Sequence, residues 1–228
     1  MIHLFNVSKV YPNGTVAVFD INLRINKGEF VFLVGPSGAG KSTLTRLIFR
    51  EQLPTSGQIY FRERNVLRLR QRELLALRRQ IGMVFQDFRL LPRKTVFENV
   101  AFALEVLGRS RRVIREQVPL ALAQVGLTGK EDAFPAELSG GEQQRVGVAR
   151  AIVKKPLLIL ADEPTGNLDP DTSWELMELF ERVNRDGTTV VIATHAWDIV
   201  NRMRKRVVAL ENGRLVRDEE QGSYSHGA

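Results

Sequence analysis

The stretch Gly35 to Thr43, GPSGAGKST, constrains the fold of this chain more than any other. It fits the pattern G-x-x-x-x-G-K-[ST] and lies between a predicted strand, Phe30 to Val34, and a predicted helix, Ser42 to Arg50. Its glycines let the backbone curl until successive N–H groups point inward at an anion, and the helix N-terminus adds its positive dipole end. The stretch therefore predicts a phosphate-binding loop in an α/β protein.

The residues of this loop are expected to surround the phosphates of a nucleotide. Lys41 would reach the β- and γ-phosphates, and the hydroxyl of Ser42 would bind Mg²⁺. The alternative is a glycine-rich turn with an unrelated lysine, and it does not explain why a strand precedes and a helix follows. The residues expected to contact the nucleotide here are Gly35, Pro36, Ser37, Gly38, Ala39, Gly40, Lys41, Ser42 and Thr43.

A second apolar run, Leu157 to Ala161, ends in the acidic pair Asp162 and Glu163. A strand that ends in Asp162 places a carboxylate where it can hold the hydration shell of Mg²⁺. Glu163 is then placed to polarise the attacking water. An acidic turn after a strand is common by itself, but beside a phosphate loop it predicts nucleotide hydrolysis.

Short apolar runs alternate with helical patterns along most of the chain, which predicts an α/β protein around a largely parallel sheet. The early strands, Ile2 to Val7 and Val18 to Ile25, are expected to form an antiparallel edge layer. The sequence Asn212-Gly213 predicts the turn of a terminal hairpin. Further predicted strands are Ile59 to Phe61, Ile81 to Phe85, Thr188 to Ala193, Val207 to Leu210 and Arg214 to Val216.

Residues 88–151 differ from the rest, because they contain helical patterns and no convincing strand. We expect one domain over residues 1–228, with residues 88–151 as a helical subdomain inserted in the α/β core. The tail from Glu219, EEQGSYSHGA, is polar and small, and is expected to fray.

The composition is that of an ordinary globular protein. The 228 residues are 43% hydrophobic and 26% charged, which suits one large domain. The chain has no cysteine, which excludes disulfides and thiolate metal sites. It has no signal-peptide pattern and no apolar window long enough to span a bilayer, so it is expected to be soluble by itself.

The net charge of +7 favours anionic partners, and two stretches concentrate the arginines. We expect them to be solvated helix faces. An alternative is attraction to anionic lipid head groups, at roughly 1 kcal/mol for each basic residue near the surface. Nucleic acid is not expected, because no aromatic residues interleave these arginines. The stretches hold Arg62, Arg64, Arg68, Arg70, Arg72, Arg78 and Arg79, and then Arg109, Arg111, Arg112 and Arg115.

A second paired-glycine turn, LSGGEQQR, begins at Leu138. Ser139 and Glu142 have the spacing of a capping box at the start of a helix. That does not explain Gly140 and Gly141, since each costs up to about 1 kcal/mol against alanine in a helix. A bare helix N-terminus is an anion site. Because the first loop is already complete, this turn is expected to serve the γ-phosphate of another nucleotide; the alternative is a capping box alone.

Taken with GPSGAGKST, Gln86, LLILADE, Asn167-Leu168-Asp169 and His195, the turn LSGGEQQR resembles the ATP-binding-cassette ATPases over nearly the whole chain. The resemblance implies an ATPase with a P-loop NTPase core, an antiparallel β edge layer and a helical subdomain, with ATP and Mg²⁺ as cofactors. In that family two cassettes pack head to tail, and each signature turn contacts the γ-phosphate held by the other subunit.

The resemblance also implies tasks for single residues. Tyr11 would stack on adenine through its ring face, with little use of its hydroxyl. Gln86 would contact the γ-phosphate and Mg²⁺, His195 would contact the γ-phosphate, and Asp169 would touch the opposing subunit. The alternatives are a packing residue for Tyr11, a surface glutamine for Gln86 and a helix-capping histidine for His195. Ala196 departs from the Asp that many relatives carry, and Asp198 could substitute for it.

Within the family, the stretches Val84 to Gly108, Ala161 to Pro170 and Asn201 to Glu219 resemble the cell-division ATPases of bacteria. That implies an integral membrane partner of the FtsX type, control of cell-wall hydrolases, a homodimer formed with ATP, and a peripheral position on the cytoplasmic side of the plasma membrane. One alternative is the ATPase of a lipoprotein-release or macrolide-exporter complex. Another is an ATP-gated dimer clamp with little turnover, against which Glu163 argues.

Overall fold

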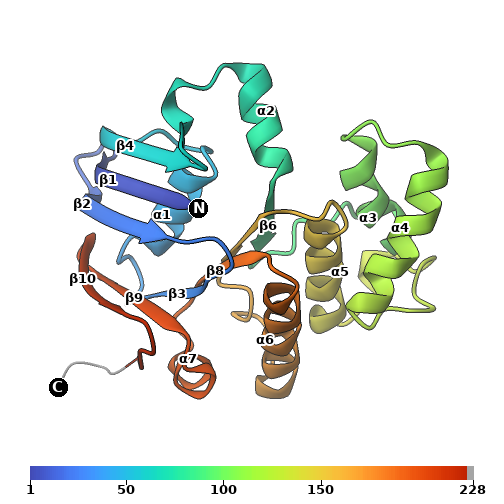
Figure 1. The fold of residues 1–228 in the computed structure, drawn as a ribbon. Helices are drawn as coiled ribbons and strands as arrows, with labels where there is room; N and C mark the ends of the chain where they lie inside the picture. Colours follow the sequence, from blue (N-terminus) through green and yellow to red (C-terminus); the bar gives the residue numbers. More distant parts are fainter. Residues whose placement is uncertain (225–228) are drawn as a thin grey trace.

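The computed structural model describes residues 1–224, and within them the strands form two sheets with helices packed on both (Figure 1). The strands are β1 (Ile2–Val10), β2 (Val16–Ile25), β3 (Phe30–Val34), β4 (Ser56–Phe61), β5 (Arg64–Asn65), β6 (Ile81–Phe85), β7 (Leu158–Asp162), β8 (Thr189–Ala193), β9 (Arg206–Glu211) and β10 (Arg214–Glu219). The helices are α1 (Lys41–Ile48), α2 (Gln71–Arg79), α3 (Val96–Glu105), α4 (Arg111–Gln124), α5 (Gly140–Ile152), α6 (Pro170–Arg185) and α7 (Trp197–Met203), with 3-10 turns η1 (Val66–Arg68) and η2 (Pro135–Glu137).

The larger sheet has the strand order β10-β9-β3-β8-β7-β6, and its strands are parallel except for β10. Both faces of this sheet are covered, which is why its central strands are continuous apolar runs such as Phe30–Val34. The register aligns Phe85, Asp162 and Ala193 across β6, β7 and β8. The residues that follow these strands therefore meet at one edge. The predicted α/β architecture with a largely parallel sheet is confirmed.

The smaller sheet has the order β2-β1-β4-β5 and is antiparallel, so the predicted edge layer is also confirmed. Helix α1 fills the space between the two sheets. Its buried residues Leu44, Leu47 and Ile48 belong to one apolar cluster with Val7 of β1 and Leu33 of β3.

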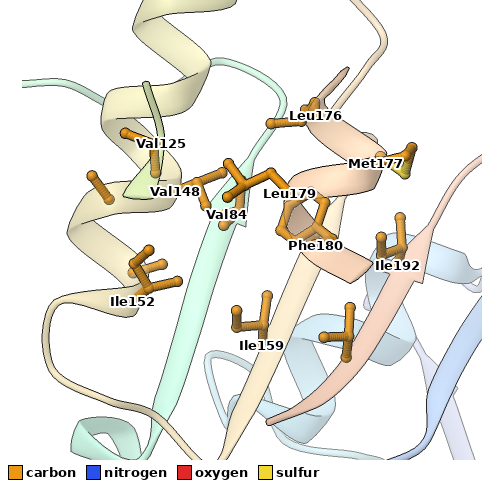
Figure 2. Close-up of a cluster of buried hydrophobic side chains, with 14 of the residues drawn as sticks. Val84, Val125, Val148, Ile152, Ile159, Leu176, Met177, Leu179, Phe180 and Ile192 are labelled. Carbon is orange, nitrogen blue, oxygen red and sulfur yellow. The ribbon is translucent and has the colours of Figure 1, made fainter. Parts of the chain in front are cut away.

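A second apolar cluster covers the other face of the larger sheet, where α5 and α6 pack (Figure 2). Val148 and Ile152 of α5 and Leu179 and Phe180 of α6 belong to this cluster together with Val84 of β6 and Ile192 of β8. The sheet is thus held between α1 on one face and α5 with α6 on the other.

Between β6 and β7 the described chain forms α3, α4, η2 and α5, and no strand. Capping boxes begin two of these helices, with Thr95 and Glu98 at α3 and Ser139 and Glu142 at α5. Figure 1 shows α3 and α4 at the side of the molecule away from the antiparallel sheet.

The expectation that the chain frays from Glu219 onward is wrong for the described part of the tail. Glu219 is the last residue of β10, the N–H of Gly222 donates to the carbonyl of Lys205 at 3.2 Å, and Tyr224 is 8% exposed. The physical reason is that burial of the Tyr224 ring offsets the entropy of ordering a polar segment. Residues 225–228 of that tail lie outside the described residues.

Most of the clustered arginines are exposed, as expected for solvated faces. Arg78 is an exception, because it donates to the carbonyl of Arg50 at 2.9 Å and its guanidinium lies over the ring of Phe49. Among residues 1–224, no helix combines the length and the apolar character needed to cross a membrane.

Candidate functional site

A cavity of about 870 Å³ opens at the edge where β3, β6, β7 and β8 end. It brings together most of the residues that the sequence singled out: its lining includes Tyr11, residues 36–43, Gln86, Glu163 and His195. Gly35 and Asp162 do not line it themselves but bond Lys41 and Ser42, which do. The signature residues 139–142 and Asp169 do not line it either. The predicted residues therefore fall into two groups, one at or beside the cavity and one apart from it.

Close backbone approach explains two glycines of the phosphate loop. A Cβ on Gly35 would lie 2.1 Å from the carbonyl oxygen of Leu210 in β9, and one on Gly40 would lie 2.3 Å from that of Ala17 in β2. Both glycines also have positive φ, 145° and 102°. The loop is therefore held between the two sheets, with its N–H groups and the start of α1 beside the cavity.

Lys41 is buried at the start of α1 and turns back into the loop. Its Nζ donates to the carbonyl oxygens of Gly35 at 2.7 Å and Pro36 at 3.1 Å, and lies 3.5 Å from Oε1 of Glu163. A buried ammonium must be paired and hydrogen-bonded. These contacts keep a positive charge between the loop and the acidic end of β7.

Ser42, which lines the cavity, contacts Asp162 at the end of β7. The Ser42 hydroxyl donates to Oδ1 of Asp162 at 2.7 Å. Burial raises the pKa of the Asp162 carboxyl above its ordinary value, while the hydrogen bond from Ser42 and the charge of Arg46 oppose that shift. A hydroxyl and a carboxylate are oxygen ligands of the kind that hard cations take.

Glu163 and His195 form the second polar pair of the cavity. Oε2 of Glu163 accepts the backbone N–H of His195 at 3.2 Å and lies 2.8 Å from its Nδ1. Glu163 has a φ of 47°, and its N–H donates to the carbonyl of Ala193 at 2.8 Å. The left-handed conformation costs about 1–2 kcal/mol for a residue with a side chain. In this site the left-handed conformation turns the mostly buried carboxylate of Glu163 away from β7 and toward the imidazole of His195.

Gln86 directly follows β6 and is exposed in the cavity. A Cβ on Gly166 would lie 2.8 Å from Nε2 of Gln86, so the glycine makes room for this side chain. Asn167 donates to the backbone carbonyl of Gln86 at 3.2 Å. The turn after β7 thus contacts the turn after β6.

The hydroxyl of Tyr11 makes two contacts, although we expected from the sequence that it would contribute little. It donates to Oε1 of Gln52 at 3.0 Å and lies 3.2 Å from Oγ1 of Thr43 in the phosphate loop. Sequence reasoning missed Gln52, and no local pattern marks it. The Tyr11 ring is therefore tied to the loop through its hydroxyl.

The capping box at the signature turn is present. Ser139 Oγ accepts the N–H of Glu142 at 3.2 Å, and Glu142 Oε2 accepts the N–H of Ser139 at 2.9 Å. That second bond lowers the pKa of the Glu142 carboxyl, and a hydrogen bond from Lys130 adds to the shift.

The two glycines of this turn have different surroundings. A Cβ on Gly141 would lie 2.4 Å from Cγ2 of Thr172, so the glycine makes room for the first turn of α6. The nearest atoms to a Cβ on Gly140 are 3.8 Å away and belong to Asn167 and Leu168. Asp169, the N-cap of α6, accepts the N–H of Thr172 at 2.9 Å. The signature turn and the Asn167–Asp169 turn therefore form one surface.

Two side chains of α5 that the sequence did not single out hold the neighbouring turns. The buried amide of Gln144 donates to the carbonyl of Pro164 at 2.8 Å and to that of Phe85 at 3.2 Å. Arg150 donates to the carbonyls of Phe88 at 2.8 Å and Arg89 at 2.6 Å. Helix α5 thus connects the signature turn to the loop after β6.

The family model described as "ABC transporter" matches residues 18–166 of the chain. Two curated proteins are similar over 98% of this chain and 98% of their own length, both called cell division ATP-binding protein FtsE. The one from Bacillus subtilis is 55% identical over 224 residues, and the one from Mycobacterium tuberculosis is 57% identical over 225 residues.

A solved structure of the ATP-binding cassette MJ0796, a dimer in a post-hydrolysis state bound to ADP and Pi, is also similar. It is 37% identical in sequence with a TM-score of 0.89, and the match covers 98% of this chain and 100% of that one.

The contacts of Tyr11 lead to a graded prediction for nucleotide binding. We expect Tyr11→Ala to weaken binding of a fluorescent ATP analogue most, because it removes the ring. Tyr11→Phe keeps the ring but loses two hydrogen-bond partners, and should weaken binding roughly 2- to 12-fold, since a net hydrogen bond contributes about 0.5–1.5 kcal/mol. Gln52→Ala should fall in the same range.

Tyr60→Phe is the matched control, because the hydroxyl of Tyr60 bonds Gln58 on the antiparallel sheet, and neither residue lines the cavity. Binding by that variant should equal that of the wild type. If Tyr11→Phe binds as well as the wild type, the hydroxyl has no part in the site; if it binds as poorly as Tyr11→Ala, the ring has none.

Proposed function

The chain belongs to the ATP-binding-cassette ATPase family, and on that premise we propose that it is the ATP-hydrolysing subunit of a bacterial cell-division complex. Two copies would close on ATP and act on an integral membrane partner of the FtsX type. The observation that carries this proposal is the cavity in which the phosphate loop, Glu163 and His195 meet. The names of the similar FtsE proteins support the cell-division role.

The loop and the start of α1 would bind the phosphates of ATP. The N–H groups of the loop and the dipole of α1 favour anions. The Lys41 ammonium, which bonds the carbonyls of Gly35 and Pro36, would bond the γ-phosphate instead. Ser42 and Asp162 fit Mg²⁺, which is usually held by one or two protein oxygens together with phosphates and waters. When bound, Mg²⁺ neutralises charge on the phosphates.

Glu163 would act as the general base. Its carboxylate would accept a proton from the attacking water while the oxygen of that water bonds the γ-phosphorus and the bond to the β–γ bridging oxygen breaks. The contact between Glu163 Oε2 and His195 Nδ1 orients both groups and leaves Nε2 of the imidazole for the γ-phosphate. Gln86 would contact the γ-phosphate and Mg²⁺ from the side of β6.

Glu163→Gln should keep ATP binding and slow hydrolysis by roughly 10²- to 10⁴-fold, the usual contribution of a positioned base. Single-turnover hydrolysis at saturating ATP measures the chemical step. Glu116→Gln on the exposed face of α4 is the control and should hydrolyse ATP at the wild-type rate. A rate for Glu163→Gln within a few-fold of wild type would remove Glu163 from the chemistry.

The surface formed by residues 139–142 and Asp169 would bind a second copy. These residues lie apart from the cavity of their own chain, and Ser139 at the start of the signature turn is exposed. In a head-to-tail pair, each signature turn would cover the γ-phosphate in the cavity of the other copy. The dimer of the similar cassette MJ0796 supports this arrangement.

Shared sites predict complementation between two defective chains. Lys41→Ala and Ser139→Arg should each fail to dimerise with Mg-ATP, because both sites of each dimer contain a broken half. In a mixed dimer the intact loop of the Ser139→Arg chain meets the intact signature of the Lys41→Ala chain, so one site is whole. Light scattering with Mg-ATP should show dimers in the mixture.

Thermal melting must show first that each variant is folded, because losing the Ser139 cap costs about 0.5–2 kcal/mol. Folded variants that give no dimer in the mixture at any ATP concentration would contradict shared sites. Ser139 and Glu142 would then serve the start of their own helix alone.

The membrane partner would dock on the loop after β6. Phe88 and Arg89 both have positive φ, and Arg150 of α5 holds their carbonyls. Phe88 and Leu91 are half-buried at this surface, whereas Leu90 packs against the core. Residues 88–151 would move as a helical subdomain and carry this loop with them. The chain would lie peripherally on the cytoplasmic side of the membrane, where the exposed arginines suit anionic lipid.

Phe88→Glu and Leu91→Glu should release the membrane partner while ATP binding stays at the wild-type level, because a buried charge at an interface is strongly unfavourable. Pull-down of the partner from detergent-solubilised membranes, scored beside ATP binding, measures this. Leu53→Glu, at an exposed leucine after α1, should retain the partner. If both loop variants retain it as well, the partner docks elsewhere.

A further inference from the structure

The last described residues return from β10 and lie along α7 (Figure 1). The N–H of Gly222 bonds the carbonyl of Lys205, just beyond the C-terminus of α7. Two residues later, the N–H of Tyr224 donates to Oδ1 of Asn201 at 2.6 Å, and Nδ2 of Asn201 donates back to the carbonyl of Tyr224 at 3.4 Å. A Cβ on Gly222 would lie 2.6 Å from Cβ of Val207, so the tail is packed directly on β9.

The ring of Tyr224 forms part of the wall of the nucleotide cavity. It is 8% exposed and belongs to the apolar cluster that includes Ile199 and Val200 of α7. It also lines the cavity together with Glu163, His195 and Trp197. Burial, and after it the charge of Glu163, raise the pKa of the Tyr224 phenol, so the ring stays uncharged. The tail therefore reaches the side of the cavity where hydrolysis is proposed.

Helix α7 depends on support of this kind. It has seven residues, and so short a helix is not stable without tertiary contacts. Its N-cap is Ala196, which has no side-chain oxygen, and the backbone N–H of Ala196 is bonded by Thr194 Oγ1 at 3.0 Å. Asp198 lies exposed in the first turn. His195 comes immediately before the N-cap of this helix, so a displacement of α7 would displace the imidazole.

We infer that Tyr224 is a positioning residue of the ATP site, which holds α7, and through it His195, against Glu163. The inference rests on the hydrolysis proposed above and adds a role for the C-terminal tail. Tyr224 acts through His195, on the side of the γ-phosphate, and not through the affinity for ATP. Its loss therefore affects the chemical step and leaves binding of the nucleotide intact.

Tyr224→Ala should lower kcat roughly tenfold and change KM for ATP less than about twofold, because small displacements of a catalytic group slow the chemical step. Asn201→Ala should also lower kcat, because it removes both hydrogen bonds to the backbone of Tyr224. Alanine is a good helix former, so this variant tests the inference even if Tyr224→Ala folds poorly. Tyr224→Phe keeps the ring and both bonds to Asn201, so it should lower kcat less than Tyr224→Ala does. Ser223→Ala, an exposed neighbour, is the control.

A double-mutant cycle separates this role from a general loss of stability. In a His195→Ala background, Tyr224→Ala should lower kcat no further, since the group that it positions is absent. If Tyr224→Ala lowers kcat as much in the His195→Ala background as it does in the wild type, the inference is overturned. It is also overturned if Tyr224→Ala and Asn201→Ala leave kcat unaltered, whether or not they raise KM. If the wild-type chain itself hydrolyses no ATP, the proposed function fails; an active wild type with additive losses overturns the role of Tyr224 alone.

Discussion

The common direction of β3, β6, β7 and β8 is the constraint on which the rest of the structure depends. Parallel neighbours end at one edge of a sheet, so the segments that follow them must meet there. The register that aligns Phe85, Asp162 and Ala193 determines which residues of these segments lie side by side. A slip of β7 by one residue would turn the side chain of Asp162 to the other face of the sheet and separate it from Ser42.

The antiparallel sheet contributes more than an edge to this arrangement. Backbone atoms of β2 and β9 approach the phosphate loop so closely that Gly35 and Gly40 have no space for a side chain. The loop is therefore held between the two sheets. Tyr11, which follows β1 of the antiparallel sheet, lies in the wall of the cavity. The shape of the loop therefore depends on both sheets as well as on its own glycines.

Helix α5 joins the two surfaces that the proposed function needs. Its N-terminus carries the signature turn, while Gln144 and Arg150 along its length hold the turns after β6 and β7. A helix resists bending and stretching, so a change at one end is transmitted to the other. In the proposed complex, contact of the signature with a second copy and docking of a membrane partner would thus be linked through one element.

Local patterns in the sequence determined the phosphate loop, the strand that ends in Asp162, the terminal hairpin and the capping box at Ser139, because each depends on residues a few positions apart. They also predicted the two kinds of sheet. The tertiary structure alone decided that Gln52 bonds Tyr11, that Thr172 fills the space beside Gly141, and that the tail is packed as far as Tyr224. Those contacts join residues that are distant in the chain, and no periodicity or turn signal marks them, because burial and close packing are settled only when the whole chain has folded.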